Sequence, residues 1–375
     1  MKKKLLLSVE CMGGGVRRHV VDLIKNINHE KFDVTLLYGA SRTDDAFHSA
    51  YTELKKYAEL VPSRYMLREI SPIMDVSAIK ESRDLIKSFK PDIVHCHSSK
   101  AGAVCRIAAK AEKVPKVFYT PHVYAFQAPE FSEKQKFAYI QIEKRLSRGA
   151  TTLTFNVSKE EKRCALKAGL DCRDKFKVIY NGIEDCPIMD KSEARQRLGL
   201  PENAFVAGVT ARLNSQKDPL TFVKIAETFV AEHPDAHFAY IGSGPFAESI
   251  NTYILHHGLE KNIHLLGYRN DAEFVVSAFD VYLLTSVYEG YPYCLVEALR
   301  AGVPLAATKV SGNKEIVKPS INGDFFEAGD VNSGVRLLEK FYKNTPYSRE
   351  SVRETFKTGF SLRRMIKTIE YFYLA

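Results

Sequence analysis

The feature that most constrains the fold of this chain is a regular alternation of two patterns. Short β-branched and apolar runs alternate with amphipathic helical stretches from end to end. This alternation is typical of parallel sheets with crossover helices, and it predicts an α/β protein. Strands are predicted at residues 4–9, 32–38, 92–97, 117–120, 151–156 and 177–180, and then at 205–211, 237–241, 263–266, 281–285 and 305–308. Helices are predicted between them, for example at 16–27 and 101–111.

The alternation pauses once, at a polar stretch that contains glycine and proline, Gly182 to Pro187. Such a stretch suits a linker, and 375 residues are enough for two domains of typical size. We therefore predict a first domain at residues 1–184 and a second at 185–359. An amphipathic helix follows the second domain at 361–374.

The formal net charge of +9 favours an anionic partner, which could be nucleic acid, a phosphorylated substrate or an acidic membrane surface. Neither a membrane-spanning helix nor a signal peptide is predicted, so we expect a cytoplasmic protein. Seven cysteines without a C-x-x-C pair argue against a disulfide framework and a structural zinc site. His95, Cys96 and His97 alternate along a predicted strand and cannot converge on one ion, so no metal site is expected.

Gly13-Gly14-Gly15 follows the first predicted strand and opens a helix. Bare backbone amides at such a place can approach a phosphate or a sugar. The segment is not G-x-G-x-x-G, and the second strand ends in Tyr38-Gly39 without an acidic residue, which argues against a dinucleotide-dependent dehydrogenase. A tight turn remains the alternative interpretation.

The strongest motif is the segment EGYPYCLVEA, from Glu289 to Ala298. Pro292 favours a first helical turn, so the segment predicts a loop that leads into a helix ending before Gly302. Glu289 would lie on the loop and Glu297 within the helix. Two carboxylates can bind sugar and ribose hydroxyls while the free amides and the helix dipole face a diphosphate. Two solvated acids beside a helix start are the alternative.

Arg212 and Lys217 follow the first strand of the second half. Open α/β sheets bind ligands outside the carboxyl ends of their strands, and an arginine with a lysine suits a diphosphate leaving group. A basic surface loop is the alternative. Two further turns, which contain Gly242 and Tyr268, follow strands at the same predicted edge and could bring backbone near a base or a ribose.

Taken together, these segments resemble the retaining family 4 glycosyltransferases of GT-B fold, over essentially the whole chain. Asn181-Gly182-Ile183, Thr120-Pro121-His122 and the segment around Ser158, where Glu161 completes a predicted capping box, add to the resemblance. It implies two Rossmann-like domains that face each other across a cleft, with a C-terminal helix at 360–375 that crosses back to the first domain. The first domain would bind the acceptor and the second the donor.

The resemblance also implies residue roles. Arg212 and Lys217 would hold the diphosphate, Glu297 the ribose and Glu289 the hydroxyls of the donor sugar, which His122 would face from the first domain. The implied catalytic residues are His122, Arg212, Lys217 and Glu289. The implied donor-binding residues are Gly14, Gly15, Arg212, Lys217, Gly242, Tyr268, Glu289, Tyr293, Leu295, Val296 and Glu297. The donor would be a nucleotide diphosphate sugar, with a UDP-sugar favoured, and neither cofactor nor metal is implied.

The acceptor side is less specific. His97, Ser98 and Lys100 lie in a stretch similar to members that build bacterial surface polysaccharides, so a glycan or lipid-linked acceptor is implied; a structural histidine with a helix cap is the alternative. Residues 131–148 mix apolar and basic side chains, which suits either anionic lipid at the inner face of the cell membrane or a core-facing helix. The stretch Asn322 to Glu327 departs from the apolar pattern of many relatives.

Two other functions remain possible from the sequence alone. A nucleotide-sugar epimerase or a phosphorylase of the same fold would have similar donor contacts. A basic nucleic-acid-binding protein is the alternative from another class, but no zinc pattern, RNP-type motif or aromatic-basic repeat supports it, and no nucleic-acid partner is expected. The sequence does not indicate an oligomeric state.

Overall fold

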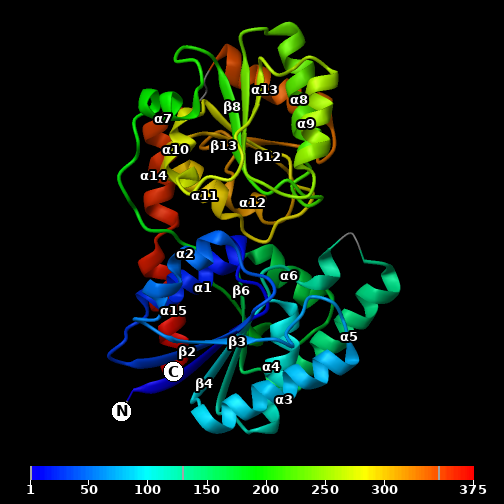
Figure 1. Ribbon diagram of the computed structural model, residues 1–375, viewed down its shortest axis with the longest axis vertical. Coiled ribbons are helices and arrows are strands. Elements are labelled where there is room, and N and C mark those ends of the chain that lie inside the picture. The colour runs from blue at the N-terminus through cyan, green and yellow to red at the C-terminus, as the bar shows by residue number, and fades with distance from the viewer. Residues whose placement is uncertain (1, 129–130, 345–346) are drawn as a thin grey trace. The chain divides into compact units, whose positions relative to one another are not determined.

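The computed structural model describes residues 2–128, 131–344 and 347–375, and it divides the chain into two units (Figure 1). Unit 1 comprises Met1–Asn181 and Leu362–Ala375, and unit 2 comprises Gly182–Ser361. Both units are parallel α/β sheets, so the predicted fold class is confirmed. Within the described residues, no helix combines the length and the apolar character that crossing a membrane requires.

Unit 1 contains, among the described residues, a seven-stranded parallel sheet in the order β3-β2-β1-β4-β5-β6-β7. Its strands are β1 (Lys3–Val9), β2 (Phe32–Gly39), β3 (Glu59–Ser63), β4 (Ile93–His97), β5 (Lys116–Thr120), β6 (Leu153–Asn156) and β7 (Phe176–Val178). The central strands are continuous buried runs because helices cover both faces of the sheet.

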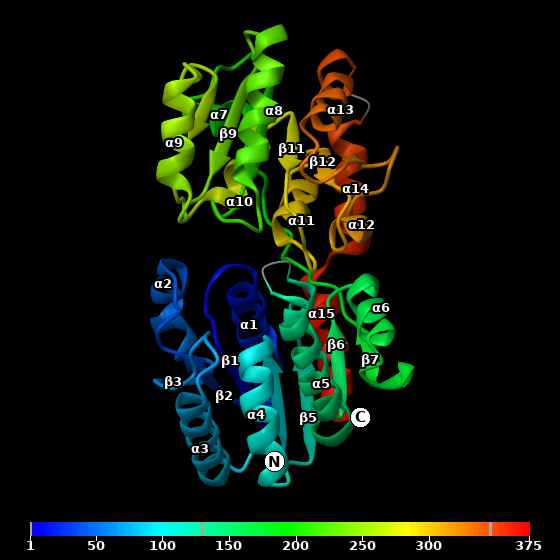
Figure 2. The ribbon, with the colours of Figure 1, turned by 90° about the vertical axis from the view of Figure 1, so that its right-hand side faces the viewer.

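The helices of unit 1 form one layer on each face of the sheet. They are α1 (Gly14–Asn26), α2 (Asp45–Leu54), α3 (Pro72–Phe89), α4 (Ser99–Ala111), η1 (Ala125–Gln127), α5 (Glu133–Ala150), α6 (Lys159–Lys167), η2 (Arg173–Lys175) and α15 (Leu362–Leu374). Side chains from α1, α2 and α15 share one core cluster, and side chains from α3, α4 and α6 share the other. Figure 2 shows α3 and α4 side by side.

The C-terminal helix α15 belongs to unit 1 although it follows unit 2 in the chain (Figure 2). Met365, Ile366 and Ile369 are buried in its core. The Tyr373 hydroxyl lies 2.5 Å from Nδ1 of His95, and Lys116 Nζ donates to the Tyr373 carbonyl over 3.0 Å. The predicted return of the last helix to the first domain is therefore confirmed.

Unit 2 contains, among its described residues, a six-stranded parallel sheet in the order β10-β9-β8-β11-β12-β13. Its strands are β8 (Val206–Thr210), β9 (His237–Ile241), β10 (Ile263–Leu265), β11 (Val281–Leu284), β12 (Leu305–Thr308) and β13 (Gly323–Phe326). Its helices are α7 (Lys191–Leu198), α8 (Pro219–Glu232), α9 (Ala247–His256), α10 (Ala272–Val275), η3 (Val276–Ala278), α11 (Tyr293–Arg300), α12 (Asn313–Ile316), α13 (Val331–Lys343) and α14 (Arg349–Gly359).

Two strands, β3 and β13, are absent from the strands that the sequence predicts. Both lie at a sheet edge and are short. β3 contains Pro62, which an edge strand tolerates because one side of its backbone makes no ladder hydrogen bonds. β13 falls in the stretch that departs from the family pattern, and there Phe326 is buried while Asn322 donates to the Ile316 carbonyl over 3.0 Å.

The strand order reverses direction once in each sheet. In unit 1 the reversal lies between β1 and β4, and in unit 2 it lies between β8 and β11. Open α/β sheets bind ligands outside the carboxyl ends of the strands at such a reversal. The expected ligand-binding region of each unit is therefore defined by its strand order.

Candidate functional site

In unit 2, the two loops at the strand reversal are joined by hydrogen bonds. The amide of Val287, after β11, donates to the Gln216 carbonyl, after β8, over 2.9 Å. The Thr285 hydroxyl donates to the Lys217 carbonyl over 2.8 Å and to the Asp218 carbonyl over 3.0 Å. Asp218 then caps α8, which begins at Pro219. The two predicted motifs, far apart in sequence, thus form one structure.

Lys217 and Glu289 form an ion pair at the centre of this structure. The side chain of Lys217 is 13% exposed and that of Glu289 is 6% exposed, so little solvent screens the pair. Burial opposes a charge on Lys217, but the Glu289 carboxylate outweighs that effect and raises the pKa of Lys217. Lys217 is therefore held as a cation.

The two carboxylate oxygens of Glu289 differ in their partners. Oε1 accepts from Lys217 Nζ and, over 2.7 Å, from the Ser286 hydroxyl. Among the described residues, the hydrogen-bond partner of Oε2 is Nε2 of Gln216, at a long distance of 3.5 Å. Oε2 therefore has capacity left to accept a hydrogen bond from a hydroxyl group of a ligand. Ser286 was not singled out from the sequence, because a serine after a strand carries no distinguishing local signal.

Arg212 lies on the same loop and has a different environment. Its residue is exposed, and within the described part of the chain no ion pair of its guanidinium is found. Like burial, the charge of Arg212 lowers the pKa of Lys217, although the larger opposite effect of Glu289 prevails, so the two cations are near each other. Two neighbouring cations, of which Arg212 makes no ion pair among the described residues, are suited to bind a polyanion.

The helix α11 begins beside this pair. Pro292 is the N-cap of α11 and not a residue of its first turn, a small correction to the prediction, and the helix ends before Gly302 as expected. Leu295 and Val296 are fully buried, so only their backbone could reach a ligand, whereas Tyr293 and Glu297 are 7% and 9% exposed. The first amides of a helix have no partner within it and favour an anion.

Three turns after neighbouring strands are stacked by backbone hydrogen bonds. Leu213 donates to the Ser243 carbonyl over 3.0 Å, and Gly242 donates to the Gly267 carbonyl over 2.8 Å. A Cβ atom at Gly242 would lie 1.9 Å from the Ala211 carbonyl oxygen, so the close approach requires glycine. Tyr268, which follows, is 48% exposed.

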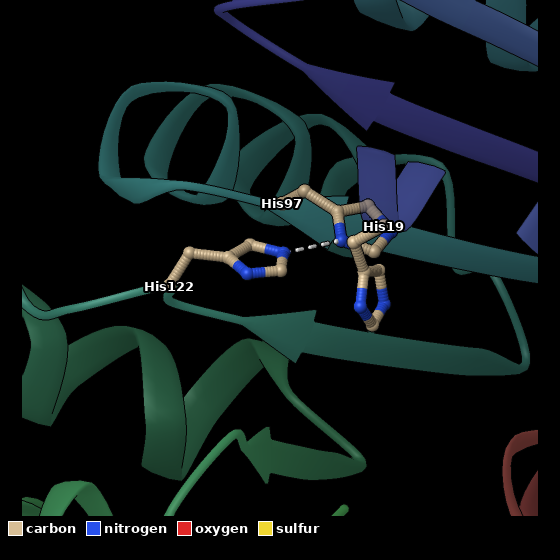
Figure 3. A group of neighbouring side chains, drawn as sticks. All are labelled: His19, His97 and His122. Atoms are coloured by element: carbon tan, nitrogen blue, oxygen red, sulfur yellow. Dashed lines mark hydrogen bonds between the residues drawn. The ribbon is translucent and has the colours of Figure 1, made fainter. Parts of the chain in front are cut away.

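In unit 1, three histidines from separate elements meet at the strand reversal (Figure 3). His19 lies on α1, His97 ends β4, and His122 follows β5. His97 Nδ1 and His122 Nε2 are hydrogen-bonded at 3.1 Å, and the ring centroids of His19 and His122 are 4.8 Å apart. His19 was missed from the sequence, because a histidine within an amphipathic helix is usually a core residue.

The three imidazoles are neutral. Burial lowers the pKa of His19 to about 4 and lowers those of His97 and His122 as well. His19 Nδ1 contacts the side-chain oxygen of Asn181 at 3.0 Å, which can only accept, so Nε2 of His19 carries a lone pair. Among the described residues, Nε2 of His19 and Nε2 of His97 are buried without a hydrogen-bond partner.

Ring nitrogens of His19, His97 and His122, one from each, lie within 4.8 Å of one another. Neutral imidazoles are ligands for zinc, so this cluster could hold a divalent cation. Hydroxyl groups of a sugar could equally donate to the same lone pairs. The expectation that the protein needs no metal stays a prediction. By contrast, His95 is a satisfied core residue, since its Nε2 contacts the Thr120 hydroxyl at 2.8 Å and its Nδ1 contacts Tyr373.

The turn that carries His122 is strained. His122 and Val123 have φ values of 52° and 80°, and such left-handed conformations are costly for residues other than glycine. The buried carboxylate of Glu161 accepts from the Val123 amide over 2.7 Å and from the Val157 amide over 2.8 Å. Ser158 caps α6, because its side chain accepts from the Glu161 amide over 3.0 Å. The Glu161 carboxylate supports the His122 turn.

The remaining candidates have partners that limit their roles. The Gly14 amide donates to the Asp44 carboxylate over 3.0 Å, at the helix start where a phosphate was expected. Lys100 Nζ donates to the Glu69 carbonyl over 2.7 Å and to Asp75 over 2.6 Å. Ser98 is the N-cap residue of α4, with a φ of 68° and without a capping hydrogen bond from its side chain. The roles of Gly14, Gly15 and the acceptor-side residues stay predictions.

Two parallel α/β units, one with paired cations and carboxylates at its strand reversal, define a class of enzymes that bind nucleotides or nucleotide-activated groups. Two family patterns match the chain: "Glycosyltransferase Family 4" over residues 13–185 and "Glycosyl transferases group 1" over residues 190–358.

One curated relative is the UDP-Gal:alpha-D-GlcNAc-diphosphoundecaprenol alpha-1,3-galactosyltransferase of Escherichia coli, which is 30% identical over 96% of this chain and 93% of its own length. The crystal structure of Anabaena HepE in complex with UDP is 21% identical, covers 98% of both chains and has a TM-score of 0.80. The complex of the same protein with UDP-glucose has a TM-score of 0.79, with the same identity and coverage. The chain belongs to glycosyltransferase family 4, has the GT-B fold and is a glycosyltransferase.

Proposed function

We propose that this enzyme transfers a sugar, with retention of anomeric configuration, from a UDP-sugar to a lipid-linked acceptor during assembly of a bacterial polysaccharide. The observation that carries the proposal is the pair Lys217 and Glu289 with the free cation Arg212 at the strand reversal of unit 2. The name of the E. coli relative contains both a UDP-sugar and a diphosphoundecaprenol acceptor, and HepE binds UDP and UDP-glucose.

In this proposal unit 2 binds the donor. Arg212 and Lys217 stabilise the diphosphate, and the free amides at the start of α11, among them those of Tyr293, Leu295 and Val296, add to the positive potential there. Oε2 of Glu289 accepts from a hydroxyl of the donor sugar, because its Oε1 is already committed to Lys217. Glu297 binds the ribose.

The remaining donor contacts follow from the stacked turns and from unit 1. We propose that the Gly242 backbone and the Tyr268 ring contact the ribose and the base. Unit 1 contributes the acceptor side, with His97, Ser98 and Lys100, and we propose that His122 faces the donor sugar, with Gly14 and Gly15 near the phosphate.

The charges of the site support a reaction without a metal ion. As the bond between sugar and phosphate breaks, negative charge grows on the leaving diphosphate, and fixed cations stabilise it. Arg212 and Lys217 can supply this countercharge. Since the acceptor is lipid-linked, we propose a cytoplasmic enzyme that works at the inner face of the cell membrane, where a basic protein meets anionic lipid.

The test is a transfer assay with a panel of UDP-, GDP- and ADP-sugars, an acceptor with a short lipid chain, and NMR assignment of the product anomer. We expect transfer only from a UDP-sugar, with the donor anomer retained. An inverted product would contradict retention, whereas an epimerised nucleotide sugar or a sugar 1-phosphate would contradict transfer itself.

The residue roles are tested by calorimetry with UDP alone. Glu297→Ala should weaken UDP binding because the ribose is present in UDP. Glu289→Gln should leave UDP affinity nearly unchanged and lower turnover, since the sugar is absent from UDP. Equal losses of UDP affinity in both variants would remove these assignments.

A further inference from the structure

Four apolar side chains project into solvent from one short segment of unit 1. Ile70, Ile73 and Val76 are 66%, 80% and 66% exposed, and Met74 is 37% exposed. Single exposed apolar residues are common, but four within seven residues form a patch that usually marks an interaction site. We call these four residues the α3 apolar surface, because they precede and begin α3.

The segment is fixed in this position by polar contacts. Lys100, from the start of α4, donates to the Glu69 carbonyl and to the Asp75 carboxylate on either side of Ile70 and Ile73. Met66, which precedes them, is fully buried in the core. The apolar side chains are therefore held outward by a structured backbone, and they do not belong to a loose loop.

Charged residues around the α3 apolar surface are mainly basic. Arg64, Arg68 and Lys80 are exposed, and Glu69 is the exposed acid between residues 64 and 80. The carboxylates of Asp75 and Glu81 are engaged by Lys100 and Ser63. Apolar side chains flanked by cations match the interface of a bilayer, where acyl chains lie beneath anionic headgroups.

The basic helix α5 packs against α4, which in turn packs against α3. Burial raises the pKa of Tyr139 on α5, and Arg68 lowers it, so Arg68 lies within electrostatic reach of that helix. On α5, Phe137 is 64% exposed. However, Glu143 on the same helix forms a buried ion pair with Arg106 at 2.8 Å, and Leu146 and Ser147 are buried as well, so this face of α5 lies against the core.

We propose that the α3 apolar surface inserts into an anionic membrane while Arg64, Arg68 and Lys80 contact lipid phosphates. The proposal rests on the proposed function, because an enzyme that modifies a lipid-linked acceptor must reach it at a bilayer. It assigns membrane contact first to the start of α3, whereas the sequence pattern suits either membrane contact or a core-facing helix at residues 131–148. Lys100 becomes a positioning residue for this surface.

The experiment measures co-flotation of the full-length protein with vesicles of phosphatidylcholine containing 30% phosphatidylglycerol. The test variant is Ile70→Ser/Ile73→Ser/Val76→Ser. The matched control is Leu255→Ser/Ile321→Ser, because these unit 2 side chains are 54% and 51% exposed. We expect the test variant to bind vesicles about tenfold more weakly or worse, since partitioning scales with buried apolar area. The control should bind like the wild type.

Charge is tested separately with Arg64→Gln/Arg68→Gln/Lys80→Gln, which should bind anionic vesicles more weakly. Pure phosphatidylcholine vesicles should bind the wild type weakly because they lack anionic lipid. Unchanged vesicle binding in the apolar test variant, or an equal loss in the control, would overturn the proposal. The α3 apolar surface could instead bind a second copy of the chain, which sedimentation equilibrium tests. If the wild type forms a dimer that the test variant does not form, and vesicle binding is unchanged, the proposal is also overturned.

Transfer assays separate this proposal from the proposed function. The test variant should transfer sugar to a short, water-soluble acceptor at the wild-type rate and to an acceptor embedded in vesicles more slowly. If the wild type transfers no sugar to any acceptor, the proposed function fails, while vesicle binding still tests the α3 apolar surface. If the test variant is equally active on both acceptors, the membrane role is wrong although the enzyme is a transferase.

Discussion

At the scale of single residues, the strand reversal of unit 2 is organised around one buried ion pair and one exposed cation. Lys217 and Glu289 stabilise each other in a region with little solvent, whereas Arg212 is exposed and close by. A buried charge that loses its partner destabilises a protein, but an exposed charge without an ion pair does not. The three residues should therefore respond differently to substitution, although we propose that all three serve the same reaction.

Arg212→Ala is expected to lower turnover by roughly 10² to 10³ while the melting temperature stays the same. The guanidinium stabilises charge that develops on the leaving diphosphate, by analogy with a single oxyanion donor. Arg212→Lys retains the charge without the planar fork and should recover part of the rate. Steady-state transfer with calorimetric melting measures both effects. Wild-type turnover in Arg212→Ala would mean that the loop is an ordinary basic surface.

Lys217→Ala is expected to reduce both turnover and stability. Removal of the cation leaves the Glu289 carboxylate buried without its countercharge, which should cost about 3 kcal/mol in the free energy of unfolding. The double variant Lys217→Met/Glu289→Gln removes both charges and should regain most of the stability but none of the activity. Urea denaturation of the three proteins provides the measurement. A single variant as stable as the wild type would show that the ion pair contributes nothing to stability.

Because of the buried histidines, we expect the free energy of unfolding to decrease in acid. The pKa of His19 is about 4 in the folded protein and about 6.5 when unfolded, so the unfolded chain binds more protons between these values. The free energy of unfolding that neutral His19 contributes is complete above pH 6.5. It falls as the pH drops toward 4 and is smaller by about 2 kcal/mol at pH 5. Calorimetric melting at pH 8, 6 and 5 should show the loss.

His19→Gln should weaken the pH dependence, and His256→Gln, on the exposed end of α9, serves as the control. If His19→Gln and the wild type lose stability in parallel between pH 8 and 5, His19 does not cause the effect.

At the scale of elements, turns are held by residues from other elements. Glu161 on α6 accepts from the amide of Val123, next to His122, and the Gly242 turn fits against the backbone after β8. These contacts keep a strained backbone in one conformation. The ligand-binding loops are therefore supported by rigid helices and strands.

Glu161→Gln is expected to lower turnover about tenfold to a hundredfold, because a small displacement of His122 is costly to a reaction that depends on alignment. The neutral amide can accept from Val123 or Val157 but more weakly than the carboxylate does. Glu160→Gln, one residue earlier on α6, is the matched control. The effect should appear in turnover more than in the KM for the donor. A change confined to the melting temperature would assign Glu161 a purely structural role.

At the scale of the whole molecule, two units with separate sheets supply the two sets of candidate residues. The donor residues gather in unit 2 and the histidine cluster in unit 1, each at a strand reversal. Charge balance at the diphosphate can come from side chains alone. The histidine cluster is the one place in unit 1, among the residues described, where a divalent ion could be held by three side chains.

Transfer activity is therefore expected to survive prolonged treatment with a strong chelator, since Arg212 and Lys217 provide the countercharge. The assay compares turnover before and after chelation, with metal content measured in both samples. Loss of activity that magnesium or manganese restores would contradict metal independence at the diphosphate. Restoration by zinc alone would instead point to His19, His97 and His122.

The sequence by itself determined the fold class, the place where the second sheet begins and the loops that carry Arg212, Lys217 and Glu289. These are local properties, because periodicity, turn residues and helix starts depend on near neighbours in the chain. The edge strands β3 and β13 were not predicted, because short strands that contain proline or glycine have weak local sequence patterns. Recognition of the family supplied the roles that local pattern could not.

Only the tertiary structure decided which residues meet. Lys217 and Glu289 are 72 residues apart, and His19, His97 and His122 come from three elements. Their contacts depend on strand order, which places distant loops side by side. Exposure is equally non-local: Ile70 and Ile73 have the apolar character of core residues, and only the packing of α3 against its neighbours leaves them in solvent. Distances and exposure follow from the arrangement of the elements, which no short stretch of sequence contains.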